Sequence, residues 1–326
     1  SAKKANDFRD KLAATLQGIS RGVASSSNLA GTTTSTQANN YVYQGSYNGD
    51  DWSGALKGYD IKAADTVLWT SNFPTWSSRN ILFNGASGVK ALAWANLAEA
   101  EKTALKSEMV VNYLRGETAN EAPNAGNLRK RSSILGDISN SSPAFVAEPV
   151  DRNYGRHSWT GASTYNAFVA DNKSRAARIY VGANDGFLHA FDASNGKETF
   201  AYMPKQMLNA STNLASYSNP FYEHKYFVDG SPIVADVYLD GAWKSIMVGS
   251  LGRGGNSLFA LDVTDPGSEF TAANVLWDKA FDKLGTITSK PVVTRLNNGS
   301  WAIVVGYGYN NSGNNSGLLV IDTQCI

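Results

Sequence analysis

The sequence predicts an all-β fold, a β-propeller of four-stranded blades, because three strand patterns recur along its 326 residues. The first is a five-residue strand that ends in Asp, and the second is a strand ending in Gly that precedes it. Connectors rich in Gly, Asn and Asp separate the two, which favours β-hairpin turns. The third is an apolar strand led by Pro, upstream of three hairpins. The Asp-ended strands are Leu56–Asp60, Leu188–Asp192, Leu258–Asp262 and Leu318–Asp322, their Gly-ended partners are Tyr41–Gly45, Ile179–Gly182, Ile246–Gly249 and Ile303–Gly306, and the Pro-led strands are Ser142–Val146, Ser231–Val234 and Lys290–Val293.

A strand with a large aromatic residue follows three of the hairpins, so a complete repeat holds four antiparallel strands. Such a sheet cannot cover both of its faces alone, and neighbouring blades therefore bury each other's apolar sides around an axis. Complete blades are predicted at about 141–203 and 230–278, and a third unit from about 290 stops after three strands at Ile326. Hairpins at 41–69 and, more weakly, at 79–94 predict one or two degenerate blades. We therefore expect an incomplete ring that continues beyond Ile326.

A few helices are predicted beside the blades. Residues 1–40 are expected to form an N-terminal helix, over 3–24, and a linker of small polar residues, whereas 41–326 form the propeller and end in mid-blade. A helical insertion near 96–116 is predicted to begin at Asn96 as its N-cap, with Glu99 three positions on, and to stop at Gly116. The loop 123–133 carries a basic triplet, which is interpreted as solvated surface. The triplet is Arg129, Lys130 and Arg131.

The composition excludes several classes of protein. The chain has 29 basic and 28 acidic residues, so no broad positive field exists to hold nucleic acid. One cysteine, Cys325, cannot form an internal disulfide, a cysteine zinc site or a redox pair. No apolar run reaches the 18 or so residues that a membrane span needs. Charged residues are only 17%, against roughly 25% in an average protein, which is typical of an exported β-rich protein.

Several strings in the chain resemble a known family. The string from Val181 to Asp192 resembles the propeller repeat of quinoprotein dehydrogenases, and a longer string, from Gly249 to Pro266, is more specific. This longer string and four shorter ones together resemble the C-terminal propeller domain of the PilC/PilY family of type IV pilus biogenesis factors and tip-associated adhesins. The resemblance runs from about Tyr41 to the end of the chain. The other strings are Arg79–Ile81, Asn112–Glu117, Leu135–Pro143 and Asp240–Trp243.

This resemblance implies a non-enzymatic protein of the bacterial cell surface. It implies a location at the pilus tip, in the outer membrane or in the periplasm, and a role in pilus extension, twitching motility and attachment. The implied partners are pilins or minor pilins, and host-cell or abiotic surfaces; no nucleic acid is expected. The family also implies a calcium loop of D-x-D-G type after the final strand, but no match occurs within residues 1–326, so no cofactor is expected in this chain. Asp50 and Asp51 are better explained as a hairpin turn, and Arg115–Glu117 as a helix end.

Two alternatives remain open at the level of the sequence. A quinoprotein oxidoreductase, which would use pyrroloquinoline quinone with calcium, shares the repeat, but the adjacent cysteines that such enzymes often carry are absent. A generic propeller scaffold that binds peptides on one face is the second alternative. The N-terminal helix and the insertion near 96–116 weigh against a plain scaffold without excluding it.

No catalytic, cofactor-binding or metal-ligating residues are predicted, because none of the three histidines has a metal-ligand spacing. His189 lies inside a strand, where a hydrogen-bonded core position is expected. Two loops are instead candidates for partner contact: the long excursion between the first two strands of the 141–203 blade, and an aromatic loop before Pro232. The candidate residues are Arg152, Tyr154, Arg156, His157, Phe221 and Tyr222.

Overall fold

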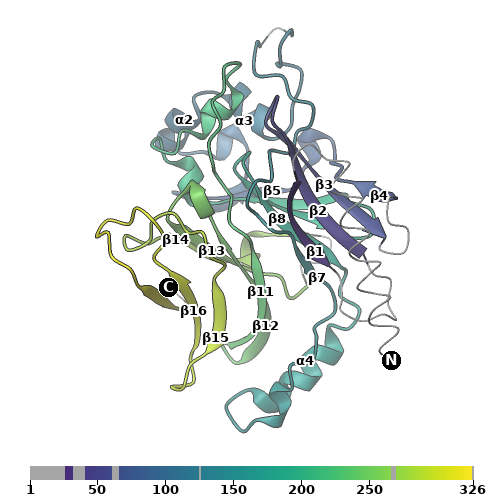
Figure 1. The fold of residues 1–326 in the computed structure, drawn as a ribbon, viewed down its shortest axis with the longest axis vertical. Coiled ribbons are helices and arrows are strands. Elements are labelled where there is room, and N and C mark those ends of the chain that lie inside the picture. Colours follow the sequence, from purple (N-terminus) through teal and green to yellow (C-terminus); the bar gives the residue numbers. More distant parts are fainter. Residues whose placement is uncertain (1–25, 32–40, 61–65, 125, 266–268, 325–326) are drawn as a thin grey trace.

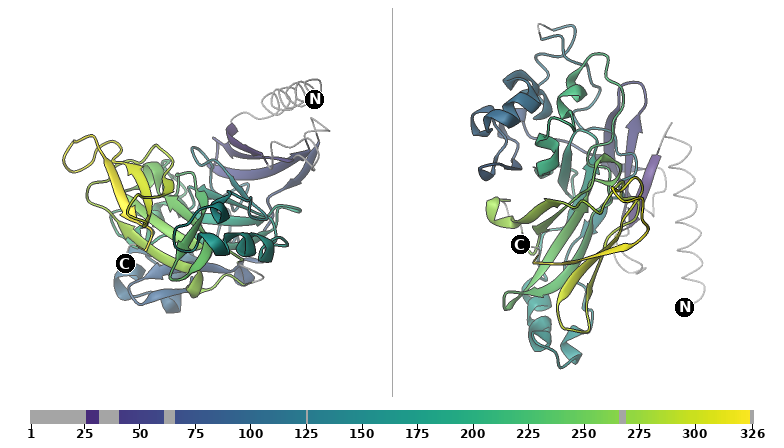
Figure 2. Two further views of the ribbon diagram at one scale, coloured as in Figure 1. Left: turned by 90° about the horizontal axis from the view of Figure 1, so that it is seen from below. Right: turned by 90° about the vertical axis from the view of Figure 1, so that its left-hand side faces the viewer.

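The computed structural model describes residues 26–31, 41–60, 66–124, 126–265 and 269–324. Four sheets follow one another in chain order across the molecule (Figure 1, Figure 2). We call them blades 1 to 4. Blade 1 consists of β1 (Ser26–Gly31), β2 (Tyr41–Asn48), β3 (Ser53–Asp60) and β4 (Val67–Thr70). Blade 2 consists of β7 (Ala144–Val146), β8 (Arg178–Ala183), β9 (Phe187–Asp192) and β10 (Glu198–Met203), and it is extended by β5 (Ile81–Gly85) and β6 (Gly88–Ala91). Blade 3 consists of β11 (Ile233–Leu239), β12 (Ala242–Ser250), β13 (Ser257–Asp262) and β14 (Val275–Ala280), and blade 4 of β15 (Val292–Arg295), β16 (Trp301–Gly306) and β17 (Leu318–Asp322).

The predicted hairpins are confirmed, and their strands pair antiparallel as expected. In blade 2, β8 and β9 pair antiparallel from Arg178 with Asp192 to Ala183 with Phe187. The corresponding hairpins β12–β13 and β16–β17 are also antiparallel. The first strands of the blades lie on the inner side, where β7 contacts both β1 and β11. The fold is therefore a β-propeller arrangement, as the repeats predict.

Apolar layers between neighbouring blades form the core. The layer between blades 1 and 2 includes Tyr43 and Ile179, and the layer between blades 3 and 4 includes Ile246 and Ile303. Blade 2 packs on blade 3 in the largest cluster, which also receives the two helices α2 (Glu99–Leu105) and α3 (Glu108–Leu114). Each blade thus buries its apolar faces against its neighbours, which is why a single blade is not stable by itself.

Outer-strand aromatic residues fasten one blade to the next. The indole nitrogen of Trp69 in blade 1 donates to the carbonyl oxygen of Ala193 in blade 2, at 3.1 Å. Trp277 of blade 3 donates in the same way to Thr323 after blade 4, at 2.9 Å. Both acceptors directly follow the Asp that ends an Asp-ended strand, so the two contacts are equivalent. Between blades 2 and 3, the ring of Phe200 occupies the matching register and stacks on a phenylalanine, Phe270, with centroids 3.8 Å apart.

The prediction of a separate degenerate blade at 79–94 is wrong. These residues form the hairpin β5–β6, and β5 joins the outer edge of blade 2 by pairing in parallel with β10. A buried ion pair fixes this position, because Arg79 Nε lies 2.6 Å from Glu198 Oε2 on β10. Glu198 in turn contacts His189 at 2.7 Å, and His189 contacts Asp185 at 3.1 Å. The expectation that His189 is a hydrogen-bonded core residue is therefore confirmed.

Predictions for the non-strand segments are corrected in three places. Part of the predicted linker, Ser26–Gly31, forms β1, which pairs with β2; the predicted helix over 3–24 lies outside the described residues. The insertion near 96–116 is two helices, because Lys106 has a φ of 69° and Ser107 caps a new helix by accepting from Val110 N. Asn96 ends a 3-10 turn instead. Gly116, at a φ of 103°, follows the second helix as expected.

The basic triplet is not a solvated surface. Arg129 and Arg131 are buried, and only Lys130 is exposed. The guanidinium of Arg129 lies over the ring of Tyr217, while Arg131 pairs with Glu121 at 2.8 Å. The two arginines thus alternate with the exposed Lys130, and their charges are met by partners inside the fold.

The remaining helices are short. One α-helix, α4 (Tyr165–Asp171), lies at the end of the molecule opposite α2 and α3 (Figure 1). The 3-10 helices are η1 (Trp76–Ser78), η2 (Trp94–Asn96), η3 (Tyr154–Arg156), η4 (Ala162–Thr164), η5 (Lys205–Leu208), η6 (Leu214–Ser218), η7 (Gly252–Gly254) and η8 (Ala272–Asn274). No helix among the described residues is both long enough and apolar enough to cross a membrane.

Candidate functional site

A pocket of about 540 Å³ lies where the inner strands β7 and β11 approach β2. We call it the β7–β11 pocket. Its volume lies within the range of roughly 300–1,000 Å³ that is typical of ligand sites. Blades 1, 2 and 3 all contribute to its wall, and so does the segment that leads from β7 toward α4. The pocket therefore depends on the assembly of three blades.

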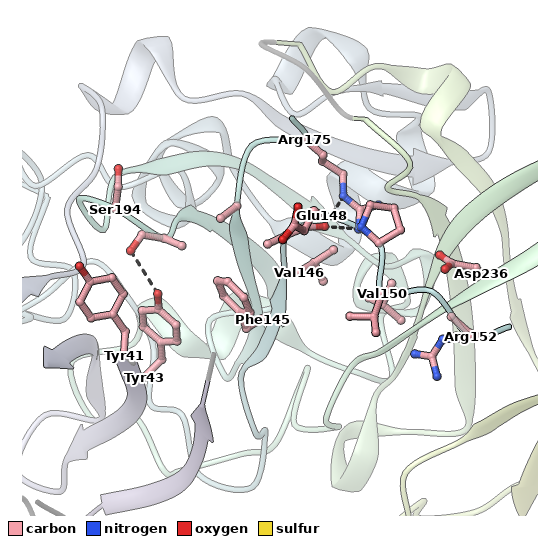
Figure 3. Close-up of a pocket in the computed structure, with 16 residues that line it drawn as sticks. Tyr41, Tyr43, Phe145, Val146, Glu148, Val150, Arg152, Arg175, Ser194 and Asp236 are labelled. Carbon is pink, nitrogen blue, oxygen red and sulfur yellow. Dashed lines mark hydrogen bonds between the residues drawn. The ribbon is translucent and has the colours of Figure 1, made fainter. Parts of the chain in front are cut away.

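One side of the pocket is apolar and aromatic. Two tyrosines of β2, Tyr41 and Tyr43, lie on this side, and Phe145 separates them from the charged residues of the opposite side (Figure 3). The rings of Tyr43 and Phe145 are stacked, with centroids 5.7 Å apart. The hydroxyl of Tyr43 donates to Ala193 O at 3.4 Å, and burial raises the pKa of this phenol. Tyr43 is thus a neutral, fixed wall residue.

The charged side of the pocket is held by hydrogen bonds within the chain. Arg175 donates through Nε to Ala147 O at 2.6 Å and through Nη1 to Ser245 Oγ at 2.8 Å. Ser245 Oγ donates to Asp236 Oδ1 at 2.6 Å, and Tyr165 donates to Asp236 Oδ2 at 2.8 Å. Burial and the neighbouring Asp236 carboxylate raise the pKa of the Tyr165 phenol. Arg175 and Asp236 are consequently engaged in the fold.

The groups that stay open to a ligand lie at the mouth of the pocket. Glu148, Val150 and Arg152 are exposed there, and Val150 has 73% of its surface accessible. Arg152 makes no ion pair or side-chain hydrogen bond with the described residues. The lining contains neither histidine nor cysteine, so the arrangement is suited to receiving an apolar group with a charged group beside it.

One of the predicted contact residues of the first loop lines this pocket. Arg152 lines it, and Arg156 and His157 are exposed in the same loop. Tyr154 is turned inward instead: its ring stacks on Trp243, with centroids 5.5 Å apart and planes at 10°. Tyr154 therefore anchors the loop, while its charged neighbours remain available.

The second predicted loop lies elsewhere. Tyr154 contacts Trp243 near the start of β12, whereas the loop of Phe221 and Tyr222 packs near Asn184 and Arg253, beyond the other end of that strand. Phe221 has 91% of its surface exposed. Tyr222 is half-buried, with its ring under the guanidinium of Arg129 and its hydroxyl bonded to Lys225. The structure thus does not bring the two predicted loops into one site.

Most of the pocket was not foreseen from the sequence. Phe145, Arg175 and Asp236 come from three separate segments, and no local motif marks them. Among the described residues, no group of three or more His, Cys, Asp or Glu side chains is placed to hold a metal ion. The calcium implied by the family resemblance stays an expectation. Asp50 and Asp51 lie in the β2–β3 turn, where Asp51 accepts from Ser53 N at 3.1 Å, as predicted.

The chain is part of a β-propeller, because antiparallel blades with inner, middle and outer strands repeat along it. A pocket lies beside the inner strands. Residues 135–325, more than half of the chain, match the family described as "PilY1 beta-propeller domain". The chain belongs to this family. The resemblance deduced from the sequence is therefore confirmed.

Curated relatives carry a related name. The chain is 38% identical over 338 residues to a "Type IV pilus biogenesis factor PilY1 homolog" of Xylella fastidiosa, covering 98% of this chain and 27% of that protein. It is 36% identical over 332 residues to the "Type IV pilus biogenesis factor PilY1" of Pseudomonas aeruginosa strain PAK, covering 92% and 28%. The chain spans about a quarter of the length of these relatives.

Two solved structures are also similar. The crystal structure of the Pseudomonas aeruginosa PilY1 C-terminal domain is 38% identical, with a TM-score of 0.43, over 56% of this chain and 35% of that one. A quinohemoprotein alcohol dehydrogenase from Comamonas testosteroni is 10% identical, with a TM-score of 0.33, over 83% of this chain and 36% of that one. The second likeness is too slight to carry any argument about activity.

Proposed function

We propose that this chain acts in type IV pilus biogenesis, and that it does so by binding a protein partner. The observation that carries the proposal is the family match over residues 135–325. The names of two relatives, both called pilus biogenesis factors, agree with it. A pilin or minor pilin is the partner that this role requires. Such a role places the protein outside the cytoplasm, at the cell surface.

Binding, not catalysis, is what the β7–β11 pocket supports. Its half-buried Arg175 and buried Asp236 are both engaged in hydrogen bonds within the fold, so neither group is free to transfer a proton. Its mouth combines exposed Val150 with Arg152, a mixture of apolar and charged groups that suits a protein surface. We assign the contact to this mouth and to the neighbouring Arg156.

The test reverses the charge of Arg152, at the mouth of the pocket, and of Arg156, farther along the same loop, in the bacterium's own gene. Arg152→Glu combined with Arg156→Glu should reduce the amount of sheared surface pili, measured by pilin immunoblot. Lys90→Glu is the matched control, because Lys90 is an exposed cation on β6, outside the pocket. The purified double variant should keep its melting temperature. Normal piliation in the double variant would contradict the assignment of the mouth, and normal piliation in a strain lacking the gene would contradict the role itself.

Tip association and attachment form the finer part of the proposal. A strain with the double variant and restored pili, obtained by blocking retraction, should attach less well to epithelial cells or glass than the same strain with Lys90→Glu. Equal attachment would restrict the role to assembly. Alcohol oxidation by the purified chain after addition of pyrroloquinoline quinone and calcium would favour the oxidoreductase alternative.

A further inference from the structure

A second, polar cavity of about 170 Å³ lies at the end of the blades away from the β7–β11 pocket. We call it the Asp229 pocket. It is lined by the segments that enter three inner strands: Asn140 before β7, Asp229–Ser231 before β11, and Ile287–Lys290 before β15. The turn after β12, at Gly252 and Arg253, closes one side. The cavity therefore lies where blades 2, 3 and 4 meet near the inner strands.

Hydrogen bonds between blades make the wall of this pocket rigid. Asn140 donates to both carboxylate oxygens of Asp229, through N at 3.1 Å and Nδ2 at 2.8 Å. Ser142 N donates to Ser231 Oγ at 2.8 Å, and Ile287 N donates to Gly252 O at 3.0 Å. Because both oxygens of Asp229 already accept hydrogen bonds, its carboxylate belongs to the wall and is not aimed at the cavity as a free ligand.

Two cations at the rim lack acidic partners. Arg253 and Lys290 are exposed and line the pocket, and neither forms an ion pair with a described residue. Arg253 is held in place on one side only, since its Nη1 donates to the Tyr226 hydroxyl at 3.2 Å and its guanidinium lies 5.2 Å from that ring. Thr288 and Ser289 add exposed hydroxyls to the same wall. The rim thus presents positive charge and hydroxyl groups, while the one carboxylate in the lining, Asp229, is engaged by Asn140.

A band of partly exposed rings leads away from Arg253. Tyr226 meets His224 edge to face, with centroids 4.9 Å apart, and His224 lies 4.0 Å from the ring of Trp52. Trp52 is stacked in turn with Tyr47, at 6.2 Å. The band joins the β2–β3 turn of blade 1 to the loop that precedes blade 3. Aromatic residues with a neighbouring arginine are the composition that is enriched where proteins bind other proteins.

We propose that the Asp229 pocket binds a carboxylate of an acidic peptide segment in a partner protein, with an adjacent apolar side chain of that segment lying on the aromatic band. Arg253 and Lys290 supply charge-assisted hydrogen bonds to the carboxylate. The cavity volume limits the group that enters to one small acidic side chain or a chain terminus. This site is separate from the β7–β11 pocket and does not depend on the pilus role.

Binding of a labelled peptide tests the proposal. The probe is a short fluorescein-labelled peptide with two aspartates beside one tryptophan, and its affinity for the purified chain is measured by fluorescence anisotropy at low salt. Arg253→Gln combined with Lys290→Gln should weaken binding at least about tenfold, since the charged partners of the carboxylate are removed. Trp52→Ala should weaken it about fivefold or more through the lost ring contact. Lys90→Gln, with an exposed cation elsewhere, should have no effect.

Changes in the probe test whether the site recognises a carboxylate. The same peptide with asparagines in place of the aspartates should bind at least about tenfold more weakly, and added inorganic phosphate should compete only at far higher concentration. The proposal is overturned if the asparagine peptide binds equally well, if the double variant binds like the unmodified chain, or if phosphate competes as well as the acidic peptide. The melting temperatures of the variants should be unchanged, which shows that weaker binding does not result from unfolding.

Discussion

Replacing Arg79 with Met tests whether a buried chain of charges holds the β5–β6 hairpin on blade 2. Arg79 donates to Glu198 through two nitrogens, Nε at 2.6 Å and Nη2 at 2.7 Å. The side chains of both residues are 1% exposed. Glu198 also contacts His189, which contacts Asp185. Burial alone would lower the pKa of His189, but the neighbouring Asp185 and Glu198 raise it to about 9. Two cations and two anions therefore alternate in the interior of one blade.

The expected loss in the free energy of unfolding is large because Glu198 remains buried when Arg79 is removed. Removing one member of a buried pair leaves an uncompensated charge and costs about 3–5 kcal/mol. Arg79→Lys retains the charge but not the two-pronged geometry, so it should cost less than Arg79→Met. Arg156→Met, at an exposed position, should cost at most about 0.5 kcal/mol.

The loss of stability in Arg79→Met should depend on pH. Burial alone would raise the pKa of Glu198, but the Arg79 guanidinium and the neighbouring His189 overcome it and hold this pKa at about 2, below the usual 4.5. The resulting stabilisation is fully present above pH 4.5 and is lost as the pH falls toward 2. Without Arg79 the pKa of Glu198 rises toward its usual value. The difference in unfolding free energy between the unmodified chain and Arg79→Met should therefore narrow by about 2 kcal/mol between pH 7 and pH 3.

Urea unfolding followed by circular dichroism at both pH values measures these differences. A loss below about 1 kcal/mol at pH 7 would refute the reasoning, because it would mean that the charges are solvated or that the hairpin is held by other contacts. A loss that is equal at pH 7 and pH 3 would show that Arg79 acts through packing and not through Glu198.

Three further outcomes are expected from the same measurement. Trp277→Ala should cost about 3–5 kcal/mol, and Trp69→Ala less, because Trp277 is buried and Trp69 is only half-buried; equal losses would contradict the packing argument. Ser141→Ala should cost about 1–3 kcal/mol, since the buried Ser141 hydroxyl donates to Gly230 O and accepts from Gly182 N, whereas the exposed Ser194→Ala should be nearly neutral. Burial raises the pKa of Asp278 from 3.8 to about 6, so between these pH values the folded state binds a proton that the unfolded state has lost. The free energy of unfolding should therefore fall by up to about 3 kcal/mol as the pH rises from 4 to above 6. Asp278→Asn should reduce this fall, and an unchanged dependence of stability on pH would show that Asp278 is not its source.

The sequence by itself determined the strands, the hairpins and the family. Strand periodicity and turn chemistry are local properties, so the pairing of Ile179–Gly182 with Leu188–Asp192 could be predicted from short segments. The buried, hydrogen-bonded position of His189 followed from its place inside such a strand. The partner-contact residues were predicted from loop length and composition, which indicate exposure but not direction. Arg152 and Phe221 are accordingly exposed, whereas Tyr154 turned inward.

Only the tertiary structure decided how distant segments meet. The β5–β6 hairpin has the local pattern of any hairpin, and the choice of blade 2 as its neighbour depends on Glu198, more than a hundred residues away. The burial of Arg129 and Arg131 likewise depends on rings supplied by other segments, Tyr217 and Tyr113. Both pockets are assembled from three blades. Their residues are separated in the chain by loops of unequal length, and the energy that brings them together comes from packing between blades, which no short stretch of sequence encodes.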